Sequence, residues 1–278
     1  MKNRNSIFKG SDGIDLFYQV WETETEKKAA VILVHGIGEH CGRYPALINT
    51  IVPRGYNVYA LEHRGHGHSS GKRGHINNWD EYRQDLRIFV QMVVDMEPDK
   101  PVYIYGHSLG GLMALDYVLY YPQNIKGIIA SAPSLAINTS PVLILLAKMM
   151  SSIVPGFTLS TNLDASAISR KKEVVEEYIN DPLVHSLASA RMGTELLATM
   201  DWTNAHAADL HMPILILQGS ADRITPAPSS QTFIEKVSSS DKQRIEYPGG
   251  YHESHNDVHA EQAMMDVANW LDNHLSIN

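Results

Sequence analysis

The hydrophobic positions of the chain fall into short, nearly continuous runs separated by longer amphipathic segments. Such runs are typical of strands buried on both faces of a parallel sheet, and the amphipathic segments between them predict connecting helices. The pattern therefore predicts an α/β fold with a mostly parallel central sheet flanked by helices. The predicted strands are Ala30–Val34, Tyr56–Leu61, Val102–Tyr105, Gly127–Ala130, Ile214–Leu217 and Arg244–Tyr247, with Ile14–Val20 as an edge strand.

Three of the intervening segments have helical spacing. Asn78 and Glu81 form a predicted capping pair ahead of a helix that runs toward Pro98. The other two predicted helices are Leu109–Tyr121, which stops before Pro122, and Asp257–Leu275 at the C-terminal end.

The alternation of strands and helices fails between Ala136 and His206. This stretch is far longer than the usual strand-to-helix connection of about 2–6 residues, so it predicts an inserted functional element. Its helix-leaning, methionine-containing sequence is typical of a helical cap. We therefore expect an α/β core of residues 1–135 and 207–278 and a cap of residues 136–206, named the predicted cap below.

Composition and charge narrow the class of partner. The 278 residues are 44% hydrophobic and carry a net charge of −8, so the chain offers no basic field for nucleic acid. The single cysteine, Cys41, excludes an internal disulfide and favours the cytoplasm. Residues 1–10 lack the apolar run of a secretory signal, and the most apolar run, Pro141–Val154, is shorter than the roughly 20 residues that span a membrane.

The strongest chemical motif is Gly106-His107-Ser108-Leu109-Gly110, which lies between a predicted strand and a predicted helix. In a G-x-S-x-G motif this context is the one that exposes a nucleophilic serine on a tight, strained turn. The glycines are needed because strand and helix crowd together there. A glycine-rich turn with an incidental serine is the alternative. We predict that Ser108 is a nucleophile.

A serine nucleophile needs a histidine base and an acid that orients it. Asp222 follows the predicted strand that ends at Leu217, and His252 follows the last predicted strand. Their order after Ser108 is the one expected of α/β-hydrolases. His255 is the nearest competitor among the 14 histidines, and the alternative for Asp222 is a turn-forming role.

Acyl transfer also needs two donors for the oxyanion of the tetrahedral intermediate. The backbone N–H of Leu109 is one predicted donor, because it directly follows the nucleophile. The other is the N–H of Ile37, in the glycine-rich segment His35-Gly36-Ile37-Gly38 that follows a predicted strand.

Four histidines crowd one glycine-rich loop: His63, His66, His68 and His75. They have neither adjacent thiolates or carboxylate clusters nor the regular spacing of a metal site. We expect side-chain hydrogen bonds to hold this turn. We predict no metal ion and no cofactor.

With these residues in view, the chain resembles the monoacylglycerol lipase and lysophospholipase group of α/β-hydrolases from about Gly10 to its end. The resemblance rests on four segments, which together are more selective than the serine motif. They are His35-Gly36-Ile37-Gly38-Glu39-His40 continuing to Gly42-Arg43-Tyr44, Glu62-His63-Arg64-Gly65-His66-Gly67-His68-Ser69, Gly106 to Gly111, and Gln218-Gly219-Ser220-Ala221-Asp222-Arg223.

The resemblance implies residues near the glycerol end of a substrate. It assigns Glu39 and Arg43, Tyr178 ahead of Asp181-Pro182-Leu183, and His255 to that end. Salt-bridged or hydrogen-bonded scaffold roles are the alternative for all four. The chain departs from the mammalian members of the family at Thr225, where they carry a cysteine, so thiol-directed inhibition is not expected there.

The resemblance also implies an apolar tunnel for an acyl chain under the cap. The residues that would line it or touch lipid are Val142–Leu146, Met149, Met150, Ile153 and Val154. Simple packing of the cap on the core is the alternative. An apolar rim could also make transient contact with a micelle or membrane.

The sequence thus favours a serine hydrolase of carboxylic esters that converts a monoacylglycerol into a fatty acid and glycerol through an acyl-enzyme. Lysophospholipase and short-chain carboxylesterase activities share the same triad and stay open. A non-catalytic ligand receptor on the same fold is the alternative of another class, although a pure binder has no need of all three triad residues.

Overall fold

Eight strands form one sheet in the computed structural model, which describes residues 1–137, 140–161 and 163–275. Strands β3 to β10 of this sheet are parallel, whereas β1 and β2 are antiparallel to their neighbours. The predicted mostly parallel sheet is confirmed. In spatial order the strands are β1 (Lys2–Lys9), β2 (Asp15–Glu22), β4 (Tyr56–Leu61), β3 (Ala29–Val34), β5 (Val102–His107), β6 (Gly127–Ser131), β9 (Ile214–Gly219) and β10 (Lys242–Tyr247).

The predicted strand Ile14–Val20 is present, but its predicted position at the edge of the sheet was wrong. This segment belongs to β2, which pairs with β4 on one side and with β1 on the other. The sequence of β1 is KNRNSIFK, and only Phe8 is buried. Because a strand with so few apolar positions shows no hydrophobic alternation, sequence pattern alone missed it.

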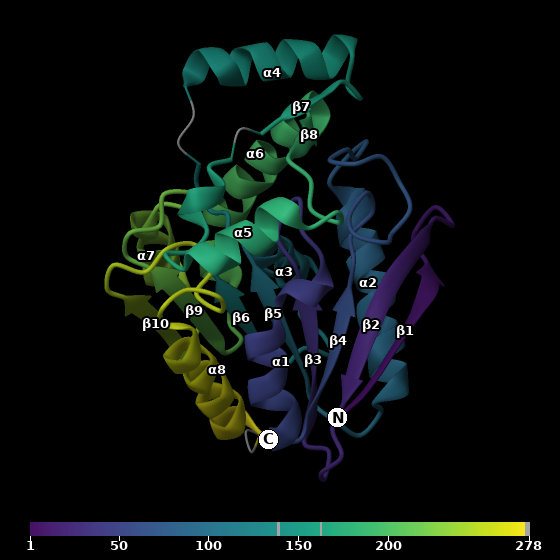
Figure 1. Cartoon of the computed structure of the whole chain (residues 1–278), viewed down its shortest axis with the longest axis vertical. Helices are drawn as coiled ribbons and strands as arrows, with labels where there is room; N and C mark the ends of the chain where they lie inside the picture. The colour runs from purple at the N-terminus through teal and green to yellow at the C-terminus, as the bar shows by residue number, and fades with distance from the viewer. Residues whose placement is uncertain (138–139, 162, 276–278) are drawn as a thin grey trace.

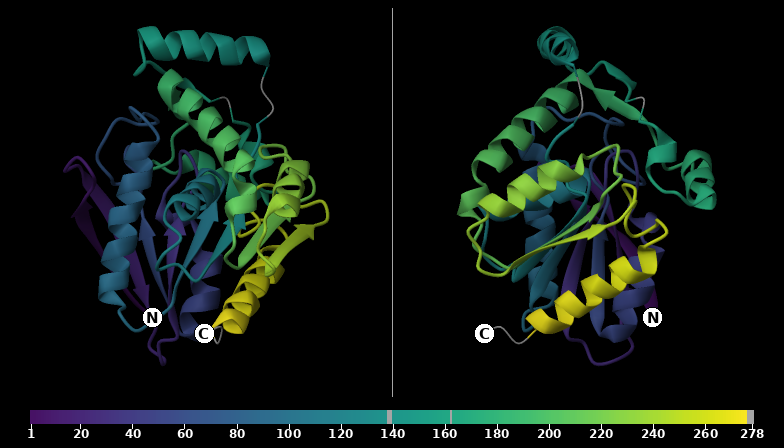
Figure 2. Two further views of the ribbon diagram at one scale, coloured as in Figure 1. Left: turned by 180° about the vertical axis from the view of Figure 1, so that it is seen from behind. Right: turned by 90° about the vertical axis from the view of Figure 1, so that its left-hand side faces the viewer.

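Helices cover both faces of the sheet (Figure 2). One face carries α1 (Pro45–Ile51) and α8 (Ala260–His274), and the other carries α2 (Asp80–Met96), α3 (Leu109–Tyr120) and α7 (Ala227–Lys236). Alternate residues of β3 reach the two cores, since Ile32 packs on the α2 and α3 side and Leu33 on the α1 and α8 side. Burial on both faces explains the continuous apolar runs.

Two helix starts differ from the prediction. Asn78 Oδ1 accepts the Glu81 N–H at 3.2 Å, but the Glu81 carboxylate accepts the N–H of Asn77. The capping pair is therefore only half formed. Helix α8 starts three residues later than predicted, because the Asp257 carboxylate accepts backbone N–H groups from Arg170 and Tyr251.

The segment between β6 and β9 lies over the carboxyl ends of the parallel strands (Figure 1). Two of its backbone N–H groups bind the core, from His185 to Gly38 O at 2.8 Å and from Ser189 to Gly74 O at 2.7 Å. Residues 138–139 and 162 of the predicted cap lie outside the described residues. Its elements are α4 (Pro141–Ile153), β7 (Thr158–Ser160), η3 (Ala165–Ala167), α5 (Lys172–Asn180), β8 (Leu187–Ser189) and α6 (Ala190–Ala205), with β7 and β8 paired.

Four short helices complete the description: η1 (Cys41–Arg43), η2 (Val52–Arg54) and η4 (Ala207–Asp209), in addition to η3. Within the described residues, no helix has both the length and the apolar character needed to cross a membrane.

Replacing the buried Ile32 of β3 should destabilise the protein far more than replacing an exposed strand isoleucine. Ile32 is fully buried, whereas Ile7 of β1 is 60% exposed. We expect Ile32→Ala to lower the free energy of unfolding by about 2–5 kcal/mol and Ile7→Ala by roughly 0.5 kcal/mol or less. Urea denaturation of both variants checks this, and equal losses would contradict the described burial.

Candidate active site

Ser108 occupies a strained turn between β5 and α3. Its φ of 52° and ψ of −116° lie in a region that residues other than glycine rarely adopt. The turn is held because the Ser108 N–H donates to Ser131 O at 2.9 Å and the Ser108 carbonyl accepts from Leu112 N at 3.1 Å. This conformation lifts the side chain out of both the strand and the helix.

Two glycines of the motif permit this turn. A Cβ atom on Gly106 would lie 2.3 Å from the Gly110 carbonyl oxygen, and one on Gly110 would lie 2.0 Å from the Val34 carbonyl oxygen. Both distances are far below van der Waals contact with backbone atoms that cannot move aside. Strand and helix therefore approach each other closely only because these positions have no side chain.

Asp222 and His252 form a buried, directly bonded pair. The Asp222 Oδ2 atom lies 2.8 Å from His252 Nδ1, and the two residues are 8% and 4% exposed. The other carboxylate oxygen accepts the N–H groups of Ile224 and Thr225 at 2.8 and 3.0 Å. Because Nδ1–H donates this hydrogen bond to the carboxylate, the neutral imidazole has its acceptor nitrogen at Nε2.

The surroundings shift both members of the pair. Burial alone would raise the pKa of Asp222, but the adjacent His252 and the Thr225 donors lower it to about 2. Burial alone would lower the pKa of His252, but the charge and hydrogen bond of Asp222, followed by the charges of Glu253 and Glu39, raise it above 6.5. Asp222 therefore stays ionised, and His252 is a stronger base than a free imidazole.

Ser108 and His252 line the same small cavity. It has a volume of about 20 Å³ and is also lined by Ile37, Glu39 and Tyr178, so it holds about one water molecule. Ser108 Oγ lies 3.4 Å from Ser134 Oγ. The other residues that line the cavity are Gly36, His107, Leu163, Ile168, Ile224 and Glu253.

The predicted oxyanion donors come from two segments that meet at this cavity. Leu109 is the first residue of α3, and N–H groups in the first turn of a helix have no acceptor within that helix. Ile37 follows β3 and lines the cavity.

Two of the four loop histidines, His63 and His66, pack against His35 and brace the segment after β3. His35 Nδ1 lies 2.7 Å from Gly36 O, and its Nε2 accepts the His63 N–H at 3.2 Å. His63 Nε2 lies 2.9 Å from His35 O, and the His66 ring lies against that of His35. Burial lowers the pKa of His63 to about 4, and burial followed by the neighbouring histidines lowers those of His35 and His66. These rings are neutral, and His63 and His66 bind backbone carbonyl oxygens, which agrees with the side-chain hydrogen bonds predicted for this turn.

The other two loop histidines have different contacts. His68 lies at the surface 3.3 Å from Glu62, and His75 Nδ1 lies 2.9 Å from Ser189 Oγ. No group of three or more His, Cys, Asp or Glu side chains that could hold a metal ion occurs in the described part of the chain.

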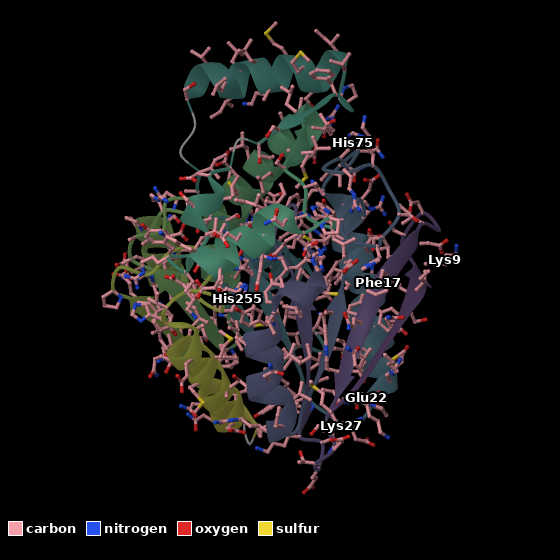
Figure 3. All side chains as sticks on the ribbon, in the orientation of Figure 1. Lys9, Phe17, Glu22, Lys27, His75 and His255 are labelled. Atoms are coloured by element: carbon pink, nitrogen blue, oxygen red, sulfur yellow. The ribbon has the colours of Figure 1, made fainter. Side chains whose placement is uncertain are left out.

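The four residues assigned to the glycerol end fall into two pairs. Glu39 and Tyr178 line the cavity. Arg43 lies behind Glu39, with its guanidinium 3.3 Å from that carboxylate and 4.6 Å from the centre of the Tyr178 ring. His255 is fully buried and stacks on Tyr44 with ring centroids 4.4 Å apart, near the middle of the molecule (Figure 3).

Sequence reasoning assigned no role beside the triad candidates to three side chains that surround them. Thr225 Oγ1 lies 2.8 Å from Asp222 Oδ2 and 3.3 Å from His252 Nδ1. Gln218 Nε2 donates to the same carboxylate at 2.9 Å. Glu253 lines the cavity beside His252. Its place directly after the predicted base was the signal in the sequence that could have found it.

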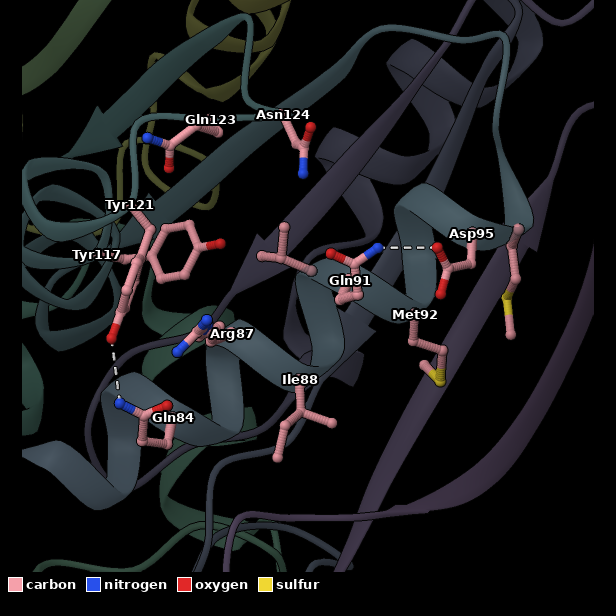
Figure 4. Close-up of a pocket in the computed structure, with 12 residues that line it drawn as sticks. Gln84, Arg87, Ile88, Gln91, Met92, Asp95, Tyr117, Tyr121, Gln123 and Asn124 are labelled. Atoms are coloured by element: carbon pink, nitrogen blue, oxygen red, sulfur yellow. Dashed lines mark hydrogen bonds between the residues drawn. The ribbon is translucent and has the colours of Figure 1, made fainter.

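A larger hollow lies away from these residues, between α2 and the end of α3. It has a volume of about 760 Å³ (Figure 4). The guanidinium of Arg87 lies 4.6 Å from the centre of the Tyr121 ring, and Gln91 donates to Asp95. None of the predicted site residues lines it, so it contributes nothing to the chemistry of Ser108.

Comparison with known proteins places this arrangement in a family. Residues 25–259 match the family model described as "Serine aminopeptidase, S33". The chain is 36% identical over 271 residues to a monoacylglycerol lipase of Mycolicibacterium smegmatis, with 96% of each chain covered. It is 30% identical to the monoglyceride lipase of Rattus norvegicus, with 96% of this chain and 90% of the relative covered.

A solved structure gives the same result. The crystal structure of the Paleococcus ferrophilus monoacylglycerol lipase matches with a TM-score of 0.86 and 36% identity, covering 93% of this chain and 99% of that one. The resemblance noted in the sequence and the predicted α/β-hydrolase fold are confirmed. The chain belongs to the monoacylglycerol lipase family of α/β-hydrolases and is a carboxylic ester hydrolase.

Proposed function

We propose that the protein hydrolyses monoacylglycerols to a fatty acid and glycerol through an acyl-enzyme on Ser108. The observation that carries this proposal is the buried Asp222–His252 pair, whose histidine lines the same cavity as a serine on a strained turn. The substrate class is supported by the 36% identical relative that is named a monoacylglycerol lipase.

The reaction would proceed in two halves. Ser108 Oγ attacks the acyl carbonyl carbon while His252 Nε2 takes the proton of the serine hydroxyl. The resulting oxyanion accepts hydrogen bonds from the N–H groups of Leu109 and Ile37. Each such donor contributes about 3–4 kcal/mol in known enzymes. The ester C–O bond then breaks, and His252 returns the proton to the departing glycerol oxygen. Water, activated in the same way by His252, releases the fatty acid from Ser108.

Asp222 would serve this cycle by fixing the imidazole. Its hydrogen bond to Nδ1 leaves Nε2 free to accept the serine proton. Its charge also stabilises the imidazolium that forms in each half-reaction. In the described conformation Ser108 Oγ lies near Ser134, and rotation about one side-chain bond would turn it toward His252.

We assign the glycerol end of the substrate to the side of the cavity near Glu39 and Tyr178. Both can exchange hydrogen bonds with hydroxyl groups, and both line the cavity. Neither Arg43, which contacts Glu39, nor His255, which stacks on Tyr44, lines this cavity.

Residues 136–206 would act as a cap that opens to admit substrate. The cavity of about 20 Å³ cannot contain a glycerol ester. Three of its walls, Leu163, Ile168 and Tyr178, come from this segment. Their movement away from Ile37 and Ile224 would widen the cavity without disturbing Asp222.

Helix α4 would bring the cap to its lipid substrate. The helix lies at the outer end of the molecule and has side chains on both its outer and its inner face (Figure 3). Ile144 and Met150 are half-buried, so only part of the predicted tunnel lining faces inward. Clusters of exposed apolar side chains are typical of surfaces that contact lipid or protein. The apolar side chains of the predicted tunnel lining that are at least 42% exposed are Val142, Leu143, Leu145, Leu146, Met149, Ile153 and Val154.

A substrate panel tests the proposed function. We expect wild type to release fatty acid from monoacylglycerols faster than from lysophospholipids, triacylglycerols or p-nitrophenyl esters. We expect Ser108→Ala to lose at least about 1000-fold in kcat with every ester. Ser134→Ala, the neighbouring serine, should lose less than about tenfold.

Activity confined to p-nitrophenyl esters would contradict the proposal that the substrate is a lipid. An aminoacyl p-nitroanilide belongs in the panel because the description of the family model names an aminopeptidase. Full activity of Ser108→Ala would overturn the mechanism.

The pH dependence of the reaction should report His252. Because only the neutral imidazole can accept the serine proton, and because its pKa is raised, kcat/KM should rise with pH through a midpoint above about 6.5. Asp222→Asn should lower kcat by about 10⁴-fold, since an amide cannot hold the required tautomer. Stopped-flow or steady-state rates between pH 5 and 9 measure both effects, and a midpoint below the ordinary value would contradict the proposed electrostatics.

Membrane docking is tested by liposome flotation of the inactive Ser108→Ala protein. We expect it to float with liposomes, and we expect added Leu145→Glu and Ile153→Glu substitutions on α4 to reduce the bound fraction at least about fivefold, because each charge opposes burial in lipid. Ile88→Glu on α2, far from the cap, is the matched control and should leave binding unchanged. Absence of a lipid-bound fraction would refute docking.

A further inference from the structure

A chain of buried charges connects the loop of His252 with the loop after β3. Glu253 follows His252 directly, and its two carboxylate oxygens accept hydrogen bonds from the Arg43 guanidinium at 2.8 and 3.0 Å. The same guanidinium donates to Glu39 at 3.3 Å. None of the three side chains is more than 8% exposed. Such bidentate, desolvated pairs are far more rigid than surface ion pairs.

The Glu39 end of this chain holds the backbone of the oxyanion loop. Glu39 Oε1 accepts the N–H of Gly36 at 2.7 Å and the hydroxyl of Tyr44 at 2.6 Å. Gly36 directly precedes Ile37, the proposed oxyanion donor. The position of the Glu39 carboxylate therefore sets where the Ile37 N–H can lie.

The Glu253 end is equally fixed. The Glu253 N–H donates to Ile168 O at 2.8 Å, and its carbonyl accepts the N–H groups of Asn256 and Asp257. The Asn256 side chain donates both to Glu253 Oε2 and to the Arg43 carbonyl, at 2.8 and 3.1 Å. Neither end of the connection can shift without breaking several buried hydrogen bonds.

Two carboxylates share one guanidinium in this cluster. Burial raises the pKa of Glu39, whereas for Glu253 burial is outweighed by the charge and hydrogen bonds of Arg43, which lower the pKa, so Glu253 is the firmer source of negative charge beside His252. The titratable groups near His252 are Asp222 from the loop after β9, Glu39 from the loop after β3, His107 from β5, and Glu253 and His255 from its own loop; Tyr178 faces the cavity from the cap. Burial and the charge of Arg43 lower the pKa of His255, and burial lowers that of His107, so both rings are neutral.

We propose that Glu253 is a positioning residue that acts through Arg43 to hold the oxyanion loop against His252, while its charge stabilises the His252 imidazolium. This inference rests on the proposed role of His252 as the base. It separates Glu253 and Arg43 from glycerol recognition. A positioning pair acts on every ester, whereas a glycerol-binding residue acts on glycerol esters alone.

Two substitutions of Glu253 separate the effect of its negative charge from the effect of its side-chain length. Glu253→Gln keeps the shape and removes the charge, so the acidic midpoint of kcat/KM should move to lower pH by on the order of one unit. Glu253→Asp keeps the charge but is one methylene shorter. Its midpoint should stay near that of wild type, while kcat falls about ten- to a hundredfold and KM changes less. Both effects should be equal for a monoacylglycerol and for p-nitrophenyl butyrate.

Asp116→Asn is the matched control. Asp116 is a buried carboxylate bound in the same bidentate way to Arg83, at 2.8 and 2.9 Å, between α2 and α3. Its replacement should leave both midpoint and kcat unchanged in the folded fraction, which thermal unfolding monitors. If Glu253→Gln does not fold, Arg43→Lys replaces it in the test. Lysine keeps the positive charge of Arg43 but cannot make two parallel hydrogen bonds to the Glu253 carboxylate. Its kcat should fall while its midpoint stays.

Three results decide the outcome. The positioning role would be overturned if Glu253→Gln had the midpoint and the kcat of wild type. Where Arg43→Lys is used instead, the same two wild-type values would overturn it. A loss confined to monoacylglycerols would assign the pair to glycerol binding instead. A fully active Ser108→Ala protein would show that the proposed function itself has failed, whatever Glu253 does.

Discussion

The close approach of α3 to the end of β3 is the contact on which the site depends. A side chain at Gly110 would collide with the carbonyl oxygens of both Val34 and His35, so a larger residue would force the helix away from the strand. Their contact places the loop that contains Ile37 beside the first turn that contains Leu109. The two proposed oxyanion donors, which are far apart in the sequence, come from these two segments. The strained backbone of Ser108 costs about 1–3 kcal/mol and is held by the hydrogen bonds of the same turn.

Around this contact, the charged groups of the site are held in place by their hydrogen bonds. The Asp222 carboxylate accepts two backbone N–H groups on one oxygen and binds Gln218, Thr225 and His252 on the other. A carboxylate with so many donors stays ionised and cannot rotate. The imidazole that it binds is therefore fixed in plane and in tautomer. Preorganisation of this kind is the main source of electrostatic stabilisation in enzymes.

Sequence reasoning succeeded wherever one local rule dominated. The double-sided burial of the sheet predicted its central strands within a few residues, since apolar runs leave few alternatives. The G-x-S-x-G motif predicted the turn at Ser108, because only glycine leaves room for the close approach of strand and helix at those positions. Sequence reasoning failed where tertiary contacts override the local pattern. Strand β1 is almost wholly polar and exists through its pairing with β2. The roles of Glu253 and Thr225 depend on which loops meet in space, and sequence spacing does not reveal that.

The predicted cap is attached unevenly. The segment around β8 is tied to the core by backbone hydrogen bonds at Gly38 and Gly74, where a Cβ atom would lie 2.2 and 2.0 Å from cap carbonyl oxygens. Helix α4 packs mainly on α6. Mutations in α4 therefore meet few constraints from the catalytic core. Evolution could alter the outer surface of this enzyme, and with it the physical form of substrate that it meets, while the reaction chemistry stays the same.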